Sequence, residues 1–176
     1  MDATNAQTAV NSIDALDIES AFAAHYGRVA RTIALVIGNR GRAEELAVDV
    51  FLKCAQSGAA SGPNPEGWLY RTAANLAIDE LRRQTRRARF DRLFQWMRAP
   101  ATPEEIHSAN QERDQVRVVL AMMQRRQAEL LVLRTQGFSY EELASTLSLN
   151  RASIGTLLKR AEQTFRKEYI AKYGPQ

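Results

Sequence analysis

The sequence predicts an all-α protein made of two small helical domains joined by a flexible linker. Apolar residues recur at spacings of three and four along several long segments, which is the spacing of one face of a helix. The 176 residues suffice for two small domains, and a polar stretch with Pro100 and Pro103 separates two helical parts. The expected divisions are a mobile acidic N-terminal arm at 1–16, a first domain at 17–98, a linker at 99–114 and a second domain at 115–173.

The charge of the chain is concentrated on its helical domains. The net charge is +4, but residues 1–27 contain four acids and no lysine or arginine, so the remainder carries about +8. A surface this basic favours a polyanion as the partner.

Targeting and redox features indicate where the protein works. No apolar run approaches the roughly 20 residues that span a bilayer, and the N-terminus lacks the basic-then-apolar layout of a secretion signal. We therefore expect no direct membrane insertion and a cytoplasmic location. The single cysteine, Cys54, excludes an internal disulfide, and its place on an apolar helical stripe favours a buried structural thiol over a reactive one.

The first domain begins with two amphipathic helices. The first is expected from about Asp17 to a C-terminal cap at Gly38, and a glycine-containing connector follows it. The second is expected from Ala43 to Gln56. Its expected buried stripe is Ala43, Leu46, Ala47, Val50 and Cys54, and its expected outer residues are Glu44, Glu45, Asp49 and Lys53.

A third helix, from Trp68 to Arg92, organises the first domain. The loop before it contains three glycines and two prolines, and Asn64 is expected to cap the helix with Pro65 in its first turn. The helical period separates an apolar stripe from a polar face. The stripe is Leu69, Ala73, Leu76, Ala77 and Leu81, and the polar face is Trp68, Thr72, Asn75, Asp79, Arg82, Arg83 and Arg86.

The C-terminal part of this helix is strongly basic. Residues 82–92 hold six arginines against the single acid Asp91. Because like charges repel one another and do not help folding, a polyanion is the natural partner. The alternative is a solvated helix end, since arginines there also suit the helix dipole. Trp68 and Asn75 on the same face favour nucleic acid, because its binding sites combine stacking, amide readout and phosphate contacts.

The second domain has the pattern of a helix-turn-helix. Ser139 and Glu142 form a capping box that opens a short helix, and a longer helix starts at Asn150 after a tight turn. In such a motif the second helix lies in the major groove of DNA. Plain structural hairpins share the pattern, but the polar outer face favours DNA binding. This face is Arg151, Ala152, Gly155, Thr156, Lys159, Arg160 and Gln163.

Two segments of the first domain resemble region two of bacterial RNA polymerase sigma factors of the extracytoplasmic-function (ECF) class, in the sigma-70 family. They are AEELAVDVFLKCAQ at 43–56 and WLYRTAANLAIDELRR at 68–83. The helix-turn-helix half resembles region four of the same family. The resemblance implies a sigma region 2 helical bundle and a sigma region 4 helix-turn-helix.

The resemblance further implies a sigma factor that binds core polymerase and directs promoter recognition, DNA melting and transcription initiation. The chain departs from the family pattern at two places in its second half. Gly155 and Leu157 stand where basic residues are frequent, and Gln124 with Arg125 replaces a common Leu-Pro pair.

The same resemblance assigns site residues. Region 2 would recognise and melt the minus-ten promoter element, and the loop before Trp68 would capture a flipped base, although a simple tether is the alternative for that loop. The implied minus-ten residues are Ser61, Asn64, Trp68, Asn75, Asp79, Arg82, Arg83, Arg86 and Arg87. The implied minus-thirty-five residues in region 4 are Arg151, Ser153, Thr156, Lys159 and Arg160. Glu45, Asp49 and Lys53 would bind core polymerase, with a solvated acidic face as the alternative.

The implied partners are macromolecules. They are core RNA polymerase, through the clamp helices of its largest subunit and the flap region of its second-largest subunit, promoter DNA as duplex and as single-stranded non-template strand, and an anti-sigma factor. Polymerase would also bring the chain to the nucleoid. No cofactor and no metal is expected.

Two other functions fit parts of the sequence. A stand-alone helix-turn-helix regulator of duplex DNA explains the second domain but not the arginine helix. An enzyme is disfavoured because the two histidines, His25 and His107, lie in different segments and no nucleophile sits beside a base.

Overall fold

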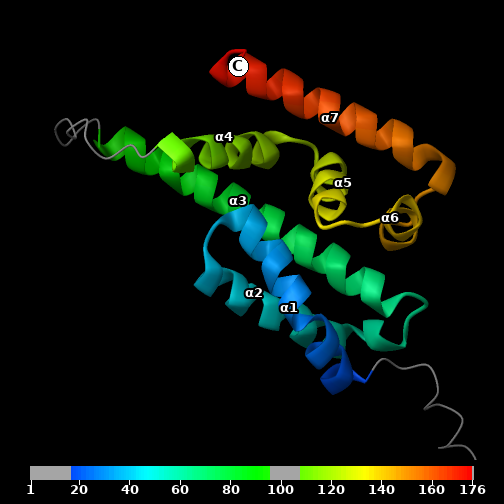
Figure 1. The fold of residues 1–176 in the computed structure, drawn as a ribbon. Helices are drawn as coiled ribbons and strands as arrows, with labels where there is room; N and C mark the ends of the chain where they lie inside the picture. Colours follow the sequence, from blue (N-terminus) through cyan, green and yellow to red (C-terminus); the bar gives the residue numbers. More distant parts are fainter. Residues whose placement is uncertain (1–16, 96–107, 176) are drawn as a thin grey trace, which may run out of the picture.

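The computed structural model describes residues 17–95 and 108–175, and the regular elements in these two ranges are all helical (Figure 1). Seven α-helices and one short 3-10 helix follow one another there, without a strand. This confirms the all-α prediction. The expected arm at 1–16 and the part of the expected linker at 96–107 lie outside the described residues.

The long helix α3 (Pro65–Gln95) is the centre of the structure. Helices α1 (Ile18–Ile37) and α2 (Arg40–Ser57) pack against it and against each other, and a 3-10 turn, η2 (Ala59–Ser61), connects α2 to α3. Helices from the second half of the chain contact α3 from another side (Figure 1). The two halves of the protein therefore share one helix as a packing surface.

The turn between α1 and α2 is shorter than the sequence indicated. Gly38 ends α1 in the left-handed conformation, at a φ of 71°, which glycine adopts without strain. Asn39 then caps α2, because its side-chain oxygen accepts a hydrogen bond from the backbone N–H of Arg42 at 2.9 Å. Helix α2 thus begins at Arg40, whereas a connector was expected up to Ala43.

The start of α3 confirms the predicted cap. The side-chain oxygen of Asn64 accepts a hydrogen bond from the backbone N–H of Gly67 at 2.8 Å, and Pro65 is the first residue of the helix. The predicted stripe is buried except at Leu76, which is half-buried. Further buried residues of α3 are Tyr70, Ala74, Ile78 and Glu80. The buried arc is wider than one stripe because helices pack on α3 from more than one direction.

The second half of the chain forms four helices. They are α4 (Ser108–Met122), α5 (Arg125–Thr135), α6 (Tyr140–Leu147) and α7 (Arg151–Tyr173). Helix α4 begins inside the segment 99–114 that was expected to be a linker. The polar composition of that segment signals exposure, and exposure is compatible with a solvated helix as well as with a loop.

The helix-turn-helix of α6 and α7 is confirmed, together with its capping box. The Ser139 hydroxyl accepts from the backbone N–H of Glu142 at 3.2 Å, and the Glu142 carboxylate accepts from the backbone N–H of Ser139 at 2.6 Å. These hydrogen bonds lower the pKa of Glu142 below its ordinary value. Ser148 ends α6 in the left-handed region, at a φ of 53°, and Asn150 caps α7.

One continuous apolar cluster holds these helices together. It includes Val29, Ile33 and Val50 of the first half and Leu133, Leu143, Leu147, Ile154 and Leu158 of the second. Cys54 is buried, as predicted, and burial raises the pKa of its thiol, which agrees with a structural role. Within the two described ranges, no helix combines the length and the apolar character needed to cross a bilayer.

The packing of α6 on α7 leaves room for a methyl group at Gly155. A Cβ there would lie 3.5 Å from Cε2 of Tyr140, an ordinary van der Waals distance. Because glycine inside a helix costs roughly 1 kcal/mol relative to alanine, Gly155→Ala is expected to raise the free energy of unfolding by about 0.5–1 kcal/mol in urea titrations. Gln163→Gly on the same helix is the converse control and should lower it. A lower free energy of unfolding for Gly155→Ala would mean that α6 and α7 pack too closely at this position to admit a methyl group.

Candidate nucleic-acid interface

The predicted polar residues of α3 lie on one side of the helix, but only its C-terminal part is free. Arg86 and Arg87 are exposed, and they form no hydrogen bond or ion pair with the rest of the described chain. Trp68 is half-buried, between the apolar stripe and this polar face. The last turns of α3 therefore offer positive charge that no acid inside the described structure neutralises.

Arg83 is tied to the interior more closely than the sequence indicated. Its guanidinium donates to Glu80 at 2.5 Å, and Arg42 of α2 donates to the same carboxylate oxygen at 3.4 Å. Glu80 is only 6% exposed, so these hydrogen bonds compensate for the burial of its carboxylate. The arrangement joins α2 to α3 and balances part of the arginine charge.

The loop before α3 is also engaged. Asn64 uses its oxygen as the helix cap, and its amide nitrogen donates to the Ser145 hydroxyl at 2.6 Å. Both the oxygen and the nitrogen of the amide are thus engaged in this arrangement. Ser61 lies in the 3-10 turn, and its side chain is outside the described ones.

Three further predicted residues of α3 contact the second half of the chain. Arg125 at the start of α5 donates to both Asn75 and Asp79, and Arg82 donates to backbone carbonyls at the end of α4. No pattern in the sequence indicates these contacts, because the partners lie 39 to 50 positions apart. On the predicted polar face of α3, Asn75, Asp79 and Arg82 are therefore covered by the second half of the chain, whereas Arg86 is exposed.

The predicted outer face of α7 is exposed except at Gly155, which is half-buried. Arg151 pairs with Glu141 of α6, and both side chains of that pair are largely exposed. An exposed ion pair contributes little, so the Arg151 guanidinium can exchange Glu141 for another anion. The exposed residues of the predicted set are Arg151, Ser153, Thr156, Lys159 and Arg160. The helix therefore presents hydroxyl, guanidinium and ammonium groups in the arrangement that a major groove accepts.

Comparison with known proteins identifies both halves of the chain. Residues 21–87 match the family model of Sigma-70 region 2, and residues 113–165 match that of Sigma-70, region 4. The ECF RNA polymerase sigma factor SigE of Mycolicibacterium smegmatis is 30% identical over 181 residues, which cover 99% of this chain and 68% of that relative. The chain belongs to the ECF RNA polymerase sigma factors.

Other relatives agree with this family. The probable ECF RNA polymerase sigma factor SigI of Mycobacterium tuberculosis is 24% identical over 88% of this chain and 56% of its own length. The chain thus spans 68% of the first relative and 56% of the second. The sigma factor RpoE of Bartonella quintana, solved in complex with the anti-sigma factor NepR, matches 90% of this chain and 99% of its own with a TM-score of 0.51 and 19% identity. That likeness supports the fold.

The family settles the general function. With region 2 and region 4 in order on one chain, the protein is a sigma factor for transcription initiation, and a stand-alone helix-turn-helix regulator is not favoured. Membership of the sigma factors implies that the protein has a regulatory role.

The outer surface of α2 in region 2 contains apolar residues that the sequence analysis missed. Val48 and Leu52 are 41% and 52% exposed, and they lie among the predicted residues Glu45, Asp49 and Lys53, which are exposed as well. Their spacing in the sequence could have identified them as apolar residues of the outer face. Two apolar residues four apart lie on the same face of a helix, so they form one exposed apolar patch away from the buried stripe.

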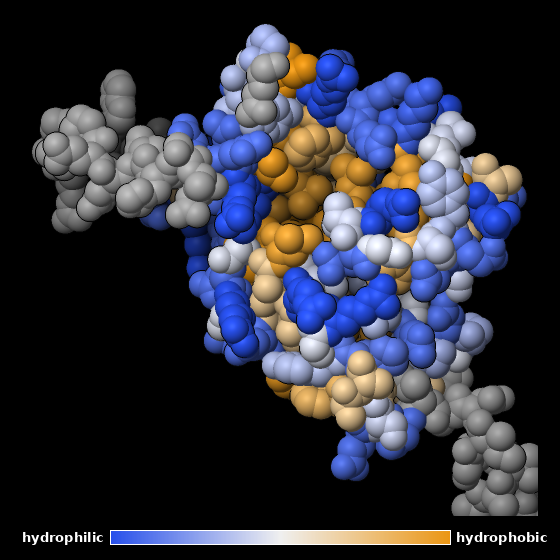
Figure 2. Space-filling view, viewed as in Figure 1, coloured by the Kyte–Doolittle hydropathy of each residue, from blue (hydrophilic) through white to orange (hydrophobic). Residues whose placement is uncertain are grey.

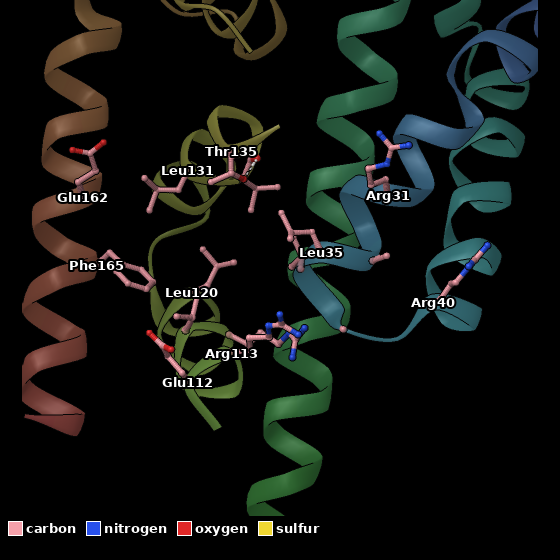
Figure 3. Close-up of a pocket in the computed structure, with 16 residues that line it drawn as sticks. Arg31, Leu35, Arg40, Glu112, Arg113, Leu120, Leu131, Thr135, Glu162 and Phe165 are labelled. Atoms are coloured by element: carbon pink, nitrogen blue, oxygen red, sulfur yellow. Dashed lines mark hydrogen bonds between the residues drawn. The ribbon is translucent and has the colours of Figure 1, made fainter. Parts of the chain in front are cut away.

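A groove of about 1100 Å³ separates parts of region 2 from region 4. Its floor is apolar, with Leu35, Leu120, Leu131 and Phe165 contributed by α1, α4, α5 and α7 (Figure 3). Figure 2 shows apolar residues gathered in a hollow that hydrophilic residues surround. The charged residues that line the groove are Arg31, Arg40, Arg113, Arg117, Glu112 and Glu162. Positive charge predominates there, so an acidic occupant suits the groove.

Proposed function

We propose that this sigma factor contacts the promoter at two places, the minus-ten element through α3 and the minus-thirty-five element through α7, while α2 holds core polymerase. The observation that carries the proposal is the presence of two exposed basic faces on the two regions of one chain. Arg86 and Arg87 mark the first face, and Lys159 and Arg160 mark the second. A regulator that binds duplex DNA alone needs only the second face.

At the minus-ten element, α3 would favour separated strands. Trp68 supplies a ring on which a base can stack, Asn75 supplies an amide for a base edge, and Arg86 with Arg87 supplies phosphate contacts. Stacking of this kind contributes roughly 1–3 kcal/mol per base and is available only when the base has left the duplex. Binding energy is thereby converted into melting. The loop with Ser61 and Asn64 would hold a flipped base once Asn64 is released from Ser145.

At the minus-thirty-five element, α7 would enter the major groove by its N-terminal half. The exposed residues Arg151, Ser153 and Thr156 would reach base edges there, and Lys159 and Arg160 would contact phosphates. Base contacts determine the preferred sequence, whereas phosphate contacts fix the position of the helix on the duplex.

Core polymerase would bind the outer surface of α2. Val48 and Leu52 form an apolar centre, and Glu45, Asp49 and Lys53 form a charged rim, which is the usual anatomy of a protein interface. The partner surfaces are the clamp helices of the largest subunit for α2 and the flap region of the second-largest subunit for region 4. The protein would be cytoplasmic, and its binding to polymerase would bring it to the nucleoid.

An anti-sigma factor is part of the same proposal. The solved RpoE of Bartonella quintana is in complex with the anti-sigma factor NepR. In this chain, the groove between the regions is apolar at its floor and rich in arginine at its edges, so it suits an amphipathic helix with acidic flanks. Such a partner would contact both regions at once.

The deciding experiment combines the purified chain with core polymerase and a library of promoter fragments, followed by mapping of transcript starts. We expect the chain to co-purify with core polymerase and to produce starts that core polymerase alone does not produce. Equal transcription with and without the chain would overturn the proposal.

Replacing Arg86 and Arg87 by alanine is expected to weaken binding to single-stranded DNA and to reduce its salt dependence. Each lost phosphate contact lowers the slope of log K against log salt by about 0.7, so the double variant should lower it by about 1.4. Fluorescence anisotropy with a labelled oligonucleotide at several salt concentrations measures the slope. An unchanged slope would mean that both arginines are merely solvated.

Replacing Val48 and Leu52 by aspartate is expected to weaken binding to core polymerase by at least about tenfold, because each substitution would desolvate a carboxylate at the centre of the interface. Biolayer interferometry with immobilised core polymerase measures the affinity. Ala24→Asp, at an exposed position of α1, is the control and should retain it. If the Val48 and Leu52 variant binds core polymerase as tightly as Ala24→Asp does, α2 is not part of the interface.

A further inference from the structure

An acidic residue lies inside the most basic part of α3. Glu80 is 6% exposed, and the arginines that the proposed function assigns to the minus-ten element begin two positions after it. A carboxylate close to a phosphate backbone is repelled by it, and this weakens binding unless another charge compensates. The presence of Glu80 on this helix therefore requires either a structural or a functional reason.

Both oxygens of the Glu80 carboxylate accept hydrogen bonds. Oε2 accepts from the Arg83 guanidinium at 2.5 Å and from the Arg42 guanidinium at 3.4 Å. Oε1 accepts from the side-chain nitrogen of Gln84 at 3.3 Å. Arg83 and Gln84 follow Glu80 by three and four positions, so these side chains share one face of α3, whereas Arg42 reaches the carboxylate from α2. Three donors from two helices thus fix the carboxylate in one place.

Arg42 compensates the charge that Glu80 brings to this face. Its guanidinium also donates to Glu45 at 2.6 Å, but the side chain of Glu45 is 66% exposed, so solvent screens that pair. The carboxylate of Glu80 is therefore shared by two guanidinium groups, one from each helix. A phosphate next to Arg83 meets a positive group although a carboxylate lies beneath it.

Arg83 is held in place but still has donors to offer. Its side chain is 46% exposed, while that of Glu80 is 7% exposed. A guanidinium has five N–H donors, and Glu80 is contacted by the Nη2 nitrogen. Among the described residues, none accepts a hydrogen bond from Nε or Nη1 of Arg83. These two nitrogens are available to a phosphate while Nη2 stays on the carboxylate.

Holding a long side chain before it binds has a measurable effect on affinity. An arginine that is free in solvent loses rotamer freedom when it contacts a phosphate, and this loss lowers the affinity by roughly two- to tenfold for each side chain. An arginine that a buried carboxylate already holds has lost this freedom on folding. Its remaining donors then point in a defined direction.

We propose that Glu80 is a positioning residue for DNA binding, which holds the Arg83 guanidinium in the orientation that a phosphate of the minus-ten strand requires, while Arg42 offsets its charge. The inference rests on the proposed function of α3, and it adds to that function a residue that does not touch DNA itself. The alternative is a purely structural connection between α2 and α3, in which the contact with Arg83 has no effect on DNA binding.

The test is Glu80→Gln in the full chain, alone and combined with Arg83→Ala. Fluorescence anisotropy measures binding to a fluorescein-labelled random 20-nucleotide single-stranded DNA. We expect Glu80→Gln to bind about fivefold less tightly than the unmodified chain, because the glutamine lacks the charge that holds Arg83. The direction is diagnostic, since the variant has lost a negative charge and simple electrostatics would strengthen its binding to a polyanion.

Asp91→Asn is the matched control. It removes the same charge from an exposed position of the same helix. We expect this variant to bind the oligonucleotide at least as tightly as the unmodified chain, because its only effect is to reduce repulsion of the phosphates.

The double variant separates positioning from a structural role. If Glu80 acts through Arg83, Glu80→Gln has no further effect on the affinity once residue 83 is alanine. A structural connection between α2 and α3 would instead weaken binding by the same factor with and without the Arg83 side chain. The melting temperature is expected to fall in either case, so the coupling between the two substitutions decides.

A second variant covers the case in which Glu80→Gln loses helix content in circular dichroism. Arg83→Lys changes an exposed residue and keeps its charge. Lysine lacks the planar fork with which an arginine can contact a carboxylate and a phosphate at once, so we expect weaker binding to the oligonucleotide. Equal affinities of Arg83→Lys and the unmodified chain would overturn the inference.

For a folded Glu80→Gln chain, two results would overturn the inference. One is an affinity equal to or higher than that of the unmodified chain, and the other is an equal loss with and without the Arg83 side chain. Arg83→Ala by itself separates this failure from that of the proposed function. If it weakens binding while Glu80→Gln does not, Arg83 contacts DNA without help from Glu80. If it has no effect, the assignment of Arg83 to the minus-ten element fails.

Discussion

The packing of α3 is the constraint on which the rest of this sigma factor depends. Small side chains at Ala73, Ala74 and Ala77 are fully buried, which lets neighbouring helices approach the α3 backbone closely. Region 2 uses one part of this surface for α1 and α2, and region 4 packs on another part. The helix that carries the proposed minus-ten residues is therefore also the helix on which the two regions meet.

Two kinds of contact hold the chain together, and they differ in strength. Inside each region, aliphatic side chains such as Ile33 and Leu143 are completely buried, and such burial is not exchanged without unfolding. Between the regions, the apolar cluster continues, as where Tyr70 meets Phe138, and polar, partly exposed contacts such as that of Arg125 with Asp79 accompany it. The polar contacts can be replaced by other polar partners, whereas separating the regions would also expose apolar surface that both halves share.

The arginines of α3 illustrate how one pattern of residues serves several purposes. Arg83 shares the buried carboxylate of Glu80 with Arg42, and this joins two helices of region 2. Arg82 binds the end of α4, whereas Arg86 lies free in solvent. From the sequence these arginines look equivalent, because each falls on or beside the polar face. Their partners distinguish the arginines that are held in place from those that are free in solvent.

The sequence by itself determined the family, the all-α fold, most helix ends, the caps at Asn64 and Ser139, and the grouping of polar residues on α3 and α7. Those features depend on residues within a few positions of one another, through local hydrogen bonds and the helical period. Only the tertiary structure decided that Asn75 and Asp79 face region 4 and that a groove separates the regions. These outcomes depend on which helices pack together, and residues that meet there, such as Asp79 and Arg125, are 46 positions apart in the chain. No local pattern specifies such a pairing, because it arises only when all the helices have buried their apolar faces at once.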